Sequence, residues 1–297
     1  MKIIDFMKWK NLFLGVSVVI ILIGLITFAV ARLNYDIDFV GGSSIQLDIN
    51  KEYTTEDGEK ITKIIKEKMG IEPSSIQKAG ATDVIIKTKP VDDAKVDDAV
   101  RTIIADYKLD QAKALKLKEN IGASVGRELK GNAILAGILA SFLILIYIAF
   151  RFEFLTGAVA VIALLHDVLI MIAVYAVFRI SVNSAFVAAI LTVLGYSIND
   201  TIIIFDRIRE NKRNMRRESY NELVNKSITQ TWARSINTVM TVVITLVVLY
   251  VMGVQSIKEF AFPLLVGVIS GAYSSIFIAA PLWLTIHNAM KKKPARA

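Results

Sequence analysis

Six stretches of the chain are long and apolar enough to cross a lipid bilayer, and this feature constrains the fold more than any other. A span needs about 20 mostly apolar residues, because the hydrocarbon core is about 30 Å thick and a helix rises about 1.5 Å per residue. Such stretches explain why 54% of the 297 residues are hydrophobic. We therefore predict a polytopic α-helical membrane protein with six transmembrane helices, over Leu12–Val30, Asn132–Phe150, Phe154–Phe178, Ser184–Phe205, Trp232–Met252 and Phe262–His287.

The first of these stretches is interpreted as a membrane anchor that stays in the mature protein. Lys8 and Lys10 precede it, as basic residues precede the apolar core of a secretory signal. Its apolar stretch is, however, longer than the roughly 7–15 residues of a signal peptide core. We therefore expect this segment to remain as the first transmembrane helix.

Basic residues are distributed unevenly between the two sides that six spans create. The termini and short loops on one side are rich in lysine and arginine, whereas the short loops on the other side carry only Arg179 and Lys258, with Arg32 at the end of the first span. Because short basic loops stay in the cytoplasm, we predict that both termini are cytoplasmic. The expected organisation is 1–33 for the N-terminus and first helix, 34–131 for an extracytoplasmic domain, 132–290 for a five-helix bundle with a basic cytoplasmic loop over 206–231, and 291–297 for a basic cytoplasmic tail.

The basic segment Asp206–Gln230 is long enough to form an amphipathic helix on the inner membrane surface. The formal net charge of +8 also raises the alternative of nucleic-acid binding. That alternative is disfavoured because no aromatic side chains are interleaved with the basic ones to stack on bases. We expect this segment to contact anionic lipid of the bilayer and not nucleic acid.

The segment outside the membrane alternates the periodicities of strands and helices. Ser43–Ile49 and Asp83–Thr88 alternate as strands, while Thr55–Met69 and Val91–Ala105 have helical patterns. With further short strands, this pattern predicts a small α+β domain of the split βαβ, ferredoxin-like kind between the first and second spans.

This segment lacks the residues of the usual enzyme sites. The chain contains no cysteine, which excludes disulfides, thiolate nucleophiles and cysteine zinc sites. A group of aspartates lacks the spacing and the glycine of a calcium loop, so we interpret it as a solvated helix start. We expect no cofactor, no metal and no enzymatic activity, but a binding or mechanical module whose strand edge could pair with an extended polypeptide. The aspartates are Asp92, Asp93, Asp97 and Asp98.

Besides His287 at the end of the last span, His, Asp and Arg side chains fall within the predicted spans at four positions, where a charge costs roughly 2.5–3.5 kcal/mol. His166 and Asp167 lie near the middle of the third span, Asp200 in the fourth, and Arg234 at the inner end of the fifth. The fourth span ends near Asp206, so Asp200 lies about six residues, roughly 9 Å, above the inner boundary. A long arginine from the fifth span can therefore reach Asp200 if the two helices pack, whereas Asp167 lies nearer the outside.

Two interpretations of Asp200 and Arg234 stay open. As a lock, they form a buried ion pair that holds the helices together. As a switch, burial favours the neutral acid and the arginine favours the carboxylate, so that moving the arginine lets the acid take up a proton. Tyr196 and Ser197 lie one turn before Asp200, and one or both hydroxyls can hydrogen-bond the carboxylate. Further polar residues are expected to support this site, namely Asn199, Thr201, Asn237 and Thr238, while His166 and Asp167 stay open between a functional and a packing role.

Seven stretches form a more specific pattern than hydropathy alone. GYSINDTIIIFDRIREN (Gly195–Asn211) includes the motif positions Gly195, Asp206 and Arg207, and YDIDFVGGSSIQL (Tyr35–Leu47) includes Asp38, Gly41 and Gly42. The other stretches are VGREL (Val125–Leu129), YIAFRFE (Tyr147–Glu153), ALLHDV (Ala163–Val168), SITQTWARSINT (Ser227–Thr238) and LLVGVISGAYSSIFIAAPL (Leu264–Leu282). In this order they resemble SecF, a family of bacterial protein-export membrane proteins in the resistance-nodulation-division superfamily.

The resemblance implies a multi-pass protein of the bacterial plasma membrane that works with SecD, the SecYEG channel and the SecA ATPase, with YajC as an additional candidate partner. It implies that the proton-motive force is used to promote translocation and release of unfolded preproteins. The family's proton-relay acid and arginine correspond to Asp200 and Arg234. Ala123 and Val239 stand where Pro and Ser are expected, and Ala280 where Ser is usual. Since the superfamily pairs two six-span halves, the chain is expected to form half of a machine.

Three other functions are alternatives to this one. A small-molecule or lipid exporter of the same superfamily usually has two larger outer inserts, whereas only one insert of under about 100 residues is expected here. An intramembrane aspartyl protease needs two carboxylates at one depth, and Asp167 and Asp200 are predicted at different depths. A scaffold that stabilises the translocon without conducting protons would use Asp200 and Arg234 as a lock.

Overall fold

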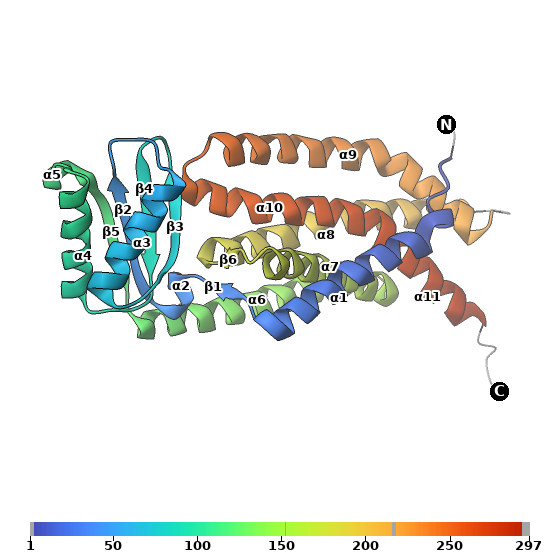
Figure 1. Cartoon of the computed structure of the whole chain (residues 1–297). Coiled ribbons are helices and arrows are strands. Elements are labelled where there is room, and N and C mark those ends of the chain that lie inside the picture. The colour runs from blue at the N-terminus through green and yellow to red at the C-terminus, as the bar shows by residue number, and fades with distance from the viewer. Residues whose placement is uncertain (1–2, 152, 216–217, 293–297) are drawn as a thin grey trace.

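The computed structural model describes residues 3–151, 153–215 and 218–292. A helical bundle forms most of the molecule, and a four-stranded sheet with two helices lies at one end of it (Figure 1). Six segments of the described residues are long and apolar enough to cross a membrane, as the sequence predicts. They contain α1 (Lys10–Ala31), α6 (Ala123–Arg151), α7 (Phe154–Val177), α8 (Ser184–Arg213), α9 (Tyr220–Met252) and α10 (Gln255–Ser274), the last continuing through a π-helical segment (Ser275–Ala279) into α11 (Ala280–Lys292).

The six segments differ in how much of their apolar surface is covered. Half or nearly half of the most apolar windows of α7, α8 and the α10–α11 segment are buried, at 50%, 44% and 61%. The corresponding values for α1, α6 and α9 are only 11%, 6% and 11%. Helices α7, α8 and α10 therefore form the interior, while α1, α6 and α9 present apolar faces to lipid or to another protein.

Small residues let the interior helices approach closely. Gly267 of α10 lies against Val193 of α8, and a Cβ atom at Gly271 would lie 2.9 Å from the Cβ atom of Ser197. On the other side of α7, Gly24 of α1 faces Ala173 at a similarly close approach. Gly267 and Gly271 are four residues apart and so lie on one face of α10, which allows the close contact between α8 and α10.

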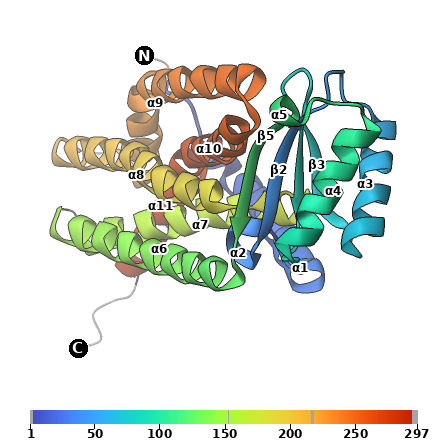
Figure 2. The same ribbon diagram turned by 90° about the vertical axis from the view of Figure 1, so that its left-hand side faces the viewer.

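The sheet has the strand order β3-β4-β2-β5, and all neighbouring strands are antiparallel. Its strands are β2 (Gly42–Asp48), β3 (Pro73–Ala79), β4 (Asp83–Thr88) and β5 (Leu115–Ile121). Helices α3 (Thr55–Met69) and α4 (Asp93–Asp106) cover one face, and the short α5 (Gln111–Ala114) precedes β5. The sheet lies between these helices and the bundle (Figure 2). Its core is formed by alternating strand residues and one face of each helix, including Leu47, Val84, Ile86, Ile61, Ile65 and Ile103.

Local capping explains where the two helices of this domain begin. Thr54 caps α3 in a capping box with Asp57. Asp92 caps α4, which therefore begins at Asp93, two residues after the predicted start at Val91. The four aspartates of this segment thus include the N-cap of a helix.

The chain between α1 and the sheet is anchored to the bundle by short polar contacts. A two-residue strand β1 (Asn34–Tyr35) pairs in parallel with β6 (Ser181–Val182), which precedes α8. The next segment, α2 (Ile37–Val40), is capped by Asp36 and ends at Gly41. Gly41 and Gly42 have φ values of 81° and 140°, and a side chain at Gly41 would meet the backbone of Ala123. Glycine is needed here for both reasons.

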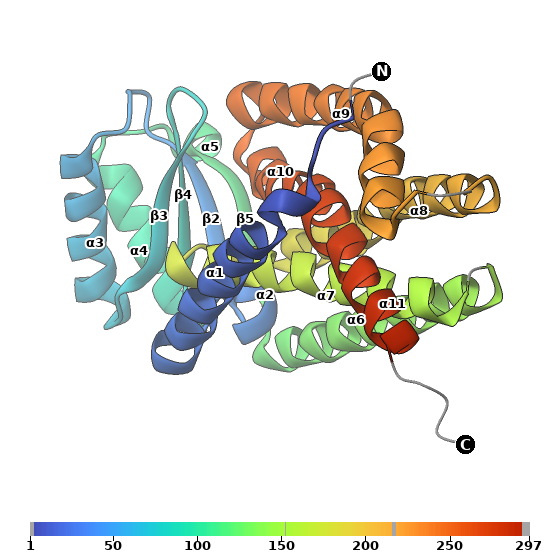
Figure 3. The same cartoon turned by 90° about the vertical axis from the view of Figure 1, so that its right-hand side faces the viewer.

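Helical structure extends into the segment 206–231, which the sequence predicts as a basic cytoplasmic loop. Helix α8 continues through Arg213 and α9 begins at Tyr220; Arg216 and Arg217 lie outside the described residues, as do 293–297 of the predicted tail. A capping box between Ser219 and Glu222 starts α9. In Figure 3, the first part of α9 runs across the end of the bundle before the helix turns alongside it.

Candidate functional site

Two groups of polar side chains lie inside the bundle, about one helical turn apart along α8. One group surrounds Asp200, and the other surrounds His166 and Asp167 of α7. Both aspartates are buried, with exposed fractions of 6% for Asp200 and 0% for Asp167. The sequence predicts all three residues as candidates, and the structure places each of them in the interior of the bundle.

Asp200 faces a narrow cavity between α8, α9 and α10. The cavity is also lined by Thr238 of α9 and by Val268 and Gly271 of α10. Its Oδ1 atom is buried and has no hydrogen-bond partner among the described residues. A buried acid with an unsatisfied oxygen is unfavourable as a carboxylate, so this site favours the uptake of a proton or of a cationic partner.

Arg234 lies on α9 but is exposed, and no ion pair joins it to Asp200 in the part of the chain that the structure describes. The hydroxyl of Thr238, one turn further along α9, donates to the Arg234 carbonyl. Thr238 lines the Asp200 cavity, so the backbone of Arg234 lies one helical turn of α9 away from that cavity. The two residues therefore lie on helices that pack against each other, but they do not form the buried ion pair that the lock interpretation requires.

The neighbours of Asp200 are only partly those that the sequence predicts. Ser197 is buried, but its hydroxyl donates to Asp167 at 2.5 Å, so the prediction that it bonds Asp200 is wrong. Tyr196 is largely exposed. The Thr201 hydroxyl contacts the Ser275 hydroxyl at 2.9 Å. Three further predicted polar residues are exposed, namely Asn199, Asn237 and Thr238, of which Asn199 and Thr238 line the cavity.

Asp167 has the most extensive set of contacts in the bundle. Its Oδ2 atom accepts hydrogen bonds from Ser197 at 2.5 Å and from Ser274 at 2.8 Å. Its Oδ1 atom accepts one from Ser270 at 2.8 Å and lies 3.0 Å from His166 Nδ1. Ser270 and Ser274 belong to α10, so spacing along α7 or α8 gives no signal that they contact Asp167.

The remaining motif residues have contacts far from Asp200. Asp38 accepts hydrogen bonds from the amide and hydroxyl of Ser184 and so ties α2 to the start of α8. At the other end of α8, Asp206 pairs with Arg209, and Arg207 contacts Glu210 and Gln230. A Cβ atom at Gly195 would meet no heavy atom within 4 Å. Asp38 therefore contacts the start of α8, and Asp206 and Arg207 lie on its last third, whereas Gly195 lies near its middle.

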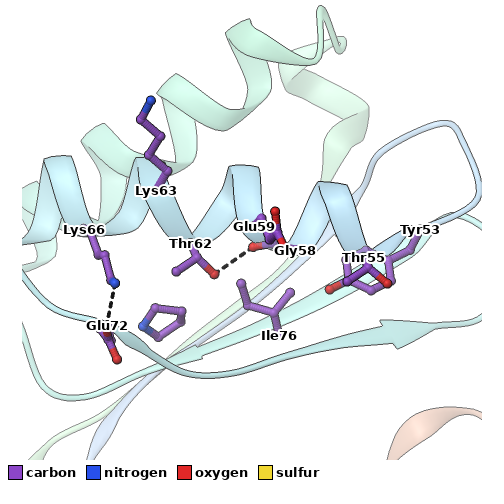
Figure 4. A pocket seen from close by; sticks show the side chains of 10 residues that line it. Tyr53, Thr55, Gly58, Glu59, Thr62, Lys63, Lys66, Glu72 and Ile76 are labelled. Atoms are coloured by element: carbon purple, nitrogen blue, oxygen red, sulfur yellow. Dashed lines mark hydrogen bonds and ion pairs between the residues drawn. The ribbon is translucent and has the colours of Figure 1, made fainter.

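Two further cavities lie away from these polar groups. A groove between α6, α7 and α8 is lined mainly by apolar side chains, together with Lys130. A pocket in the sheet domain lies between α3 and β3 (Figure 4). In that pocket Lys66 pairs with Glu72, and the Thr62 hydroxyl donates to the Gly58 carbonyl. No group of three or more potential metal ligands is present in the described residues.

Comparisons with known proteins relate these features to a family. Residues 101–289 match the family described as protein export membrane protein SecD/SecF, C-terminal. Over 297 residues the chain is 37% identical to protein translocase subunit SecF of Alicyclobacillus acidocaldarius, covering 98% of this chain and 96% of that protein. Over 295 residues it is also 37% identical to protein translocase subunit SecDF of Bacillus subtilis, covering 97% of this chain and 39% of that protein.

A solved structure gives the same result. SecDF from Thermus thermophilus, described as a translocon-associated membrane protein, matches with a TM-score of 0.85 and 31% identity. The match covers 97% of this chain and 39% of that one. The chain therefore spans about two fifths of the SecDF proteins it matches, but nearly the whole length of separate SecF subunits.

Proposed function

The chain belongs to the SecF family of protein translocase subunits, and from this premise we propose that it is the SecF half of a SecD–SecF complex that uses the proton-motive force to promote preprotein translocation and release. The fused SecDF relatives support SecD as the partner, because this chain corresponds to one part of them. We also propose SecYEG, SecA and YajC as partners of this complex. Its substrate would be the unfolded preprotein. The protein would act as a transport subunit and not as an enzyme.

The proposed topology follows the charge distribution of the sequence. Both termini and the basic ends of α8 and α9 would face the cytoplasm, in the plasma membrane of a bacterium. The sheet domain would then lie outside the membrane, and its βαββαβ order of elements supports a ferredoxin-like fold. The apolar faces of α1, α6 and α9 would contact lipid or SecD.

The observation that carries the proposed mechanism is the buried, unpartnered Oδ1 atom of Asp200. Without a cation beside it, the site favours the protonated acid, and an approaching Arg234 would favour the carboxylate. Movement of α9 relative to α8 would therefore alternate the two states and couple proton movement to a change in helix packing. The open arrangement of Asp200 and Arg234 supports such a switch over a permanent lock.

The test is proton-driven export by an Asp200→Asn variant co-expressed with SecD. Asparagine keeps the shape of the side chain but cannot take up or release a proton. We expect normal assembly with SecD and loss of the gradient-dependent release of a preprotein from membrane vesicles. Asp206→Asn is a matched control on the same helix, because Asp206 is more exposed and pairs with Arg209.

Three outcomes are distinguishable. Loss of gradient-dependent release with intact assembly supports the switch. Loss of assembly or stability supports the lock, since removing one partner leaves a buried charge unpaired. Gradient-dependent export that persists in Asp200→Asn at the level of the control would refute the assignment of Asp200 as the proton-carrying group.

A further inference from the structure

A chain of hydrogen bonds runs from His166 to the backbone of α1, and its direction can be derived. The Tyr273 hydroxyl donates to the Phe13 carbonyl at 2.7 Å, because a carbonyl only accepts. That hydroxyl has one proton, so Ser17, at 3.1 Å, donates to Tyr273. The Ser17 proton is thereby used, and His166 Nε2, 3.0 Å away, must donate to Ser17. The Nε2 atom of His166 therefore carries a proton.

The opposite side of the ring faces a carboxylate that already accepts three hydroxyl protons. Ser197 and Ser270 have Asp167 as their acceptor, and Ser274 lies closer to Asp167, at 2.8 Å, than to the Gly271 carbonyl, at 3.2 Å. His166 Nδ1 is the fourth neighbour. Two carboxylate oxygens offer about four acceptor positions, all of which are used when Nδ1 also donates.

From the hydrogen bonds on the two sides of the His166 ring, we propose that His166 and Asp167 form an imidazolium–carboxylate pair. This pair is a proton-holding site distinct from Asp200. Both ring nitrogens carry protons, Asp167 is ionised, and the pair has no net charge. Its burial within a predicted span is explained by this neutrality and by the four hydrogen bonds to the carboxylate, since a buried ion pair is tolerated when its remaining hydrogen bonds are satisfied.

The surroundings of the pair favour holding the proton rather than exchanging it. His166 is 7% exposed and Asp167 is 0% exposed. The helices packed against the pair are α1, α8 and α10, and the titratable groups that they bring near it are Tyr273, Tyr196 and Asp200. Tyr273 is the one that contacts the ring, while Tyr196 is largely exposed. Loss of the proton would leave an uncompensated negative charge on Asp167, whose partner Ser197 lies one helical turn before the unsatisfied Asp200.

The pair also joins four helices. Ser17 belongs to α1, Ser197 to α8, and Ser270 and Ser274 to α10, all held by two adjacent residues of α7. Ser197 and Gly271, beside Ser270, line the cavity of Asp200. The pair thus fixes two walls of that cavity, while Asp200 itself keeps an unpartnered oxygen.

The test is nitrogen NMR of ¹⁵N-histidine-labelled protein in lipid, because protonated and bare ring nitrogens give well-separated signals. The chain contains two histidines, so His287→Gln leaves His166 as the only labelled ring. We expect both nitrogens to be protonated at pH 7 and above. A bare nitrogen at either position would overturn the proposal.

A second variant tests the role of the carboxylate. In Asp167→Asn the imidazolium loses its counter-charge, so we expect one ring nitrogen to lose its proton at neutral pH. A ring that stays doubly protonated in this variant would also overturn the proposal. The His287→Gln spectrum decides the protonation state even where Asp167→Asn is not recovered. Neither readout depends on export activity, so failure here is distinguishable from failure of the Asp200 switch.

Discussion

Lys87 of β4 connects the sheet domain to the bundle, and its removal should loosen this connection. Its Nζ atom lies 2.6 Å from Asp36 Oδ2, at the cap of α2, and 3.4 Å from Glu259 Oε1, near the start of α10. The side chains of Lys87 and Asp36 are only 13% and 4% exposed. The Glu259 carboxylate also accepts a hydrogen bond from Asn183. This cluster joins β4 to three segments of the bundle end.

In Lys87→Met the apolar length of the side chain is kept and the charge is lost. Removing one partner of a buried ion pair costs about 3–5 kcal/mol. Because Glu259 is 24% exposed and regains some water, we expect the lower end, about 3 kcal/mol. For amides whose exchange requires this connection to open, such a loss corresponds to roughly 100-fold faster hydrogen exchange.

The assay is hydrogen exchange of the full chain in lipid, read for peptides of α2 and β4. Lys116→Met is the matched control, since Lys116 pairs with Asp48 and Asp83 but is 43% exposed. An exposed pair of this kind contributes about 0–1 kcal/mol. Exchange in α2 and β4 that is equal in the two variants would refute the assignment of a buried connection. Adding Asp36→Asn to Lys87→Met should restore part of the protection.

The pH dependence of this connection has a defined sign. Burial by itself lowers the pKa of Lys87, but the charges and hydrogen bonds of Asp36 and Glu259 together raise it above its ordinary value of 10.5. When the pKa of a lysine is higher in the folded state than in the unfolded state, the charged lysine stabilises the fold at any pH below its unfolded-state pKa. This stabilisation is lost as the pH rises through the folded-state pKa. The connection should therefore be unchanged near neutral pH and weaken above about pH 10.5.

Two further predictions concern the sheet domain and the bundle. Burial alone would raise the pKa of Asp57, but hydrogen bonds from Lys51, Thr54 and Tyr107 lower it from 3.8 to about 2. This depressed pKa contributes about 2 kcal/mol above pH 4, lost as pH falls toward 2, so hydrogen exchange of α3 should accelerate in that range and much less in Asp57→Asn. In the bundle, Gly271→Ala adds a Cβ atom 2.9 Å from that of Ser197 and should lower the free energy of unfolding of the purified protein by about 1–3 kcal/mol. Gly137→Ala is the control, because a Cβ atom there meets no atom within 4 Å and should leave thermal unfolding unchanged. Equal effects of the two substitutions would contradict the close packing of α8 and α10.

The sequence is sufficient to predict the six spanning helices, because each contains a long apolar window. It does not predict how far α8 and α9 extend beyond those windows. Charged helical turns outside a bilayer have no hydropathy signal, and their stability here comes from local pairs such as Arg209 with Asp206 and from the Ser219 cap. Both helices therefore extend beyond the predicted spans into the segment 206–231.

The buried polar residues could be found from the sequence, but their partners could not. Spacing along α8 places Ser197 beside Asp200, yet its hydroxyl turns to Asp167 on α7. Helical spacing predicts neighbours on one helix and contains no information about which face of another helix packs there. Lys87 was missed for a similar reason, since a lysine in an alternating strand ordinarily faces solvent.

The central claim is that Asp200 is the carboxyl group that exchanges a proton, while Asp167 stays ionised. Infrared difference spectroscopy of the SecD-containing complex in lipid tests this claim directly, because a protonated carboxyl group has its own C=O band. On acidification we expect a new band that disappears in Asp200→Asn and persists in Asp167→Asn. A band that persists in Asp200→Asn, or that disappears in Asp167→Asn, would contradict the account.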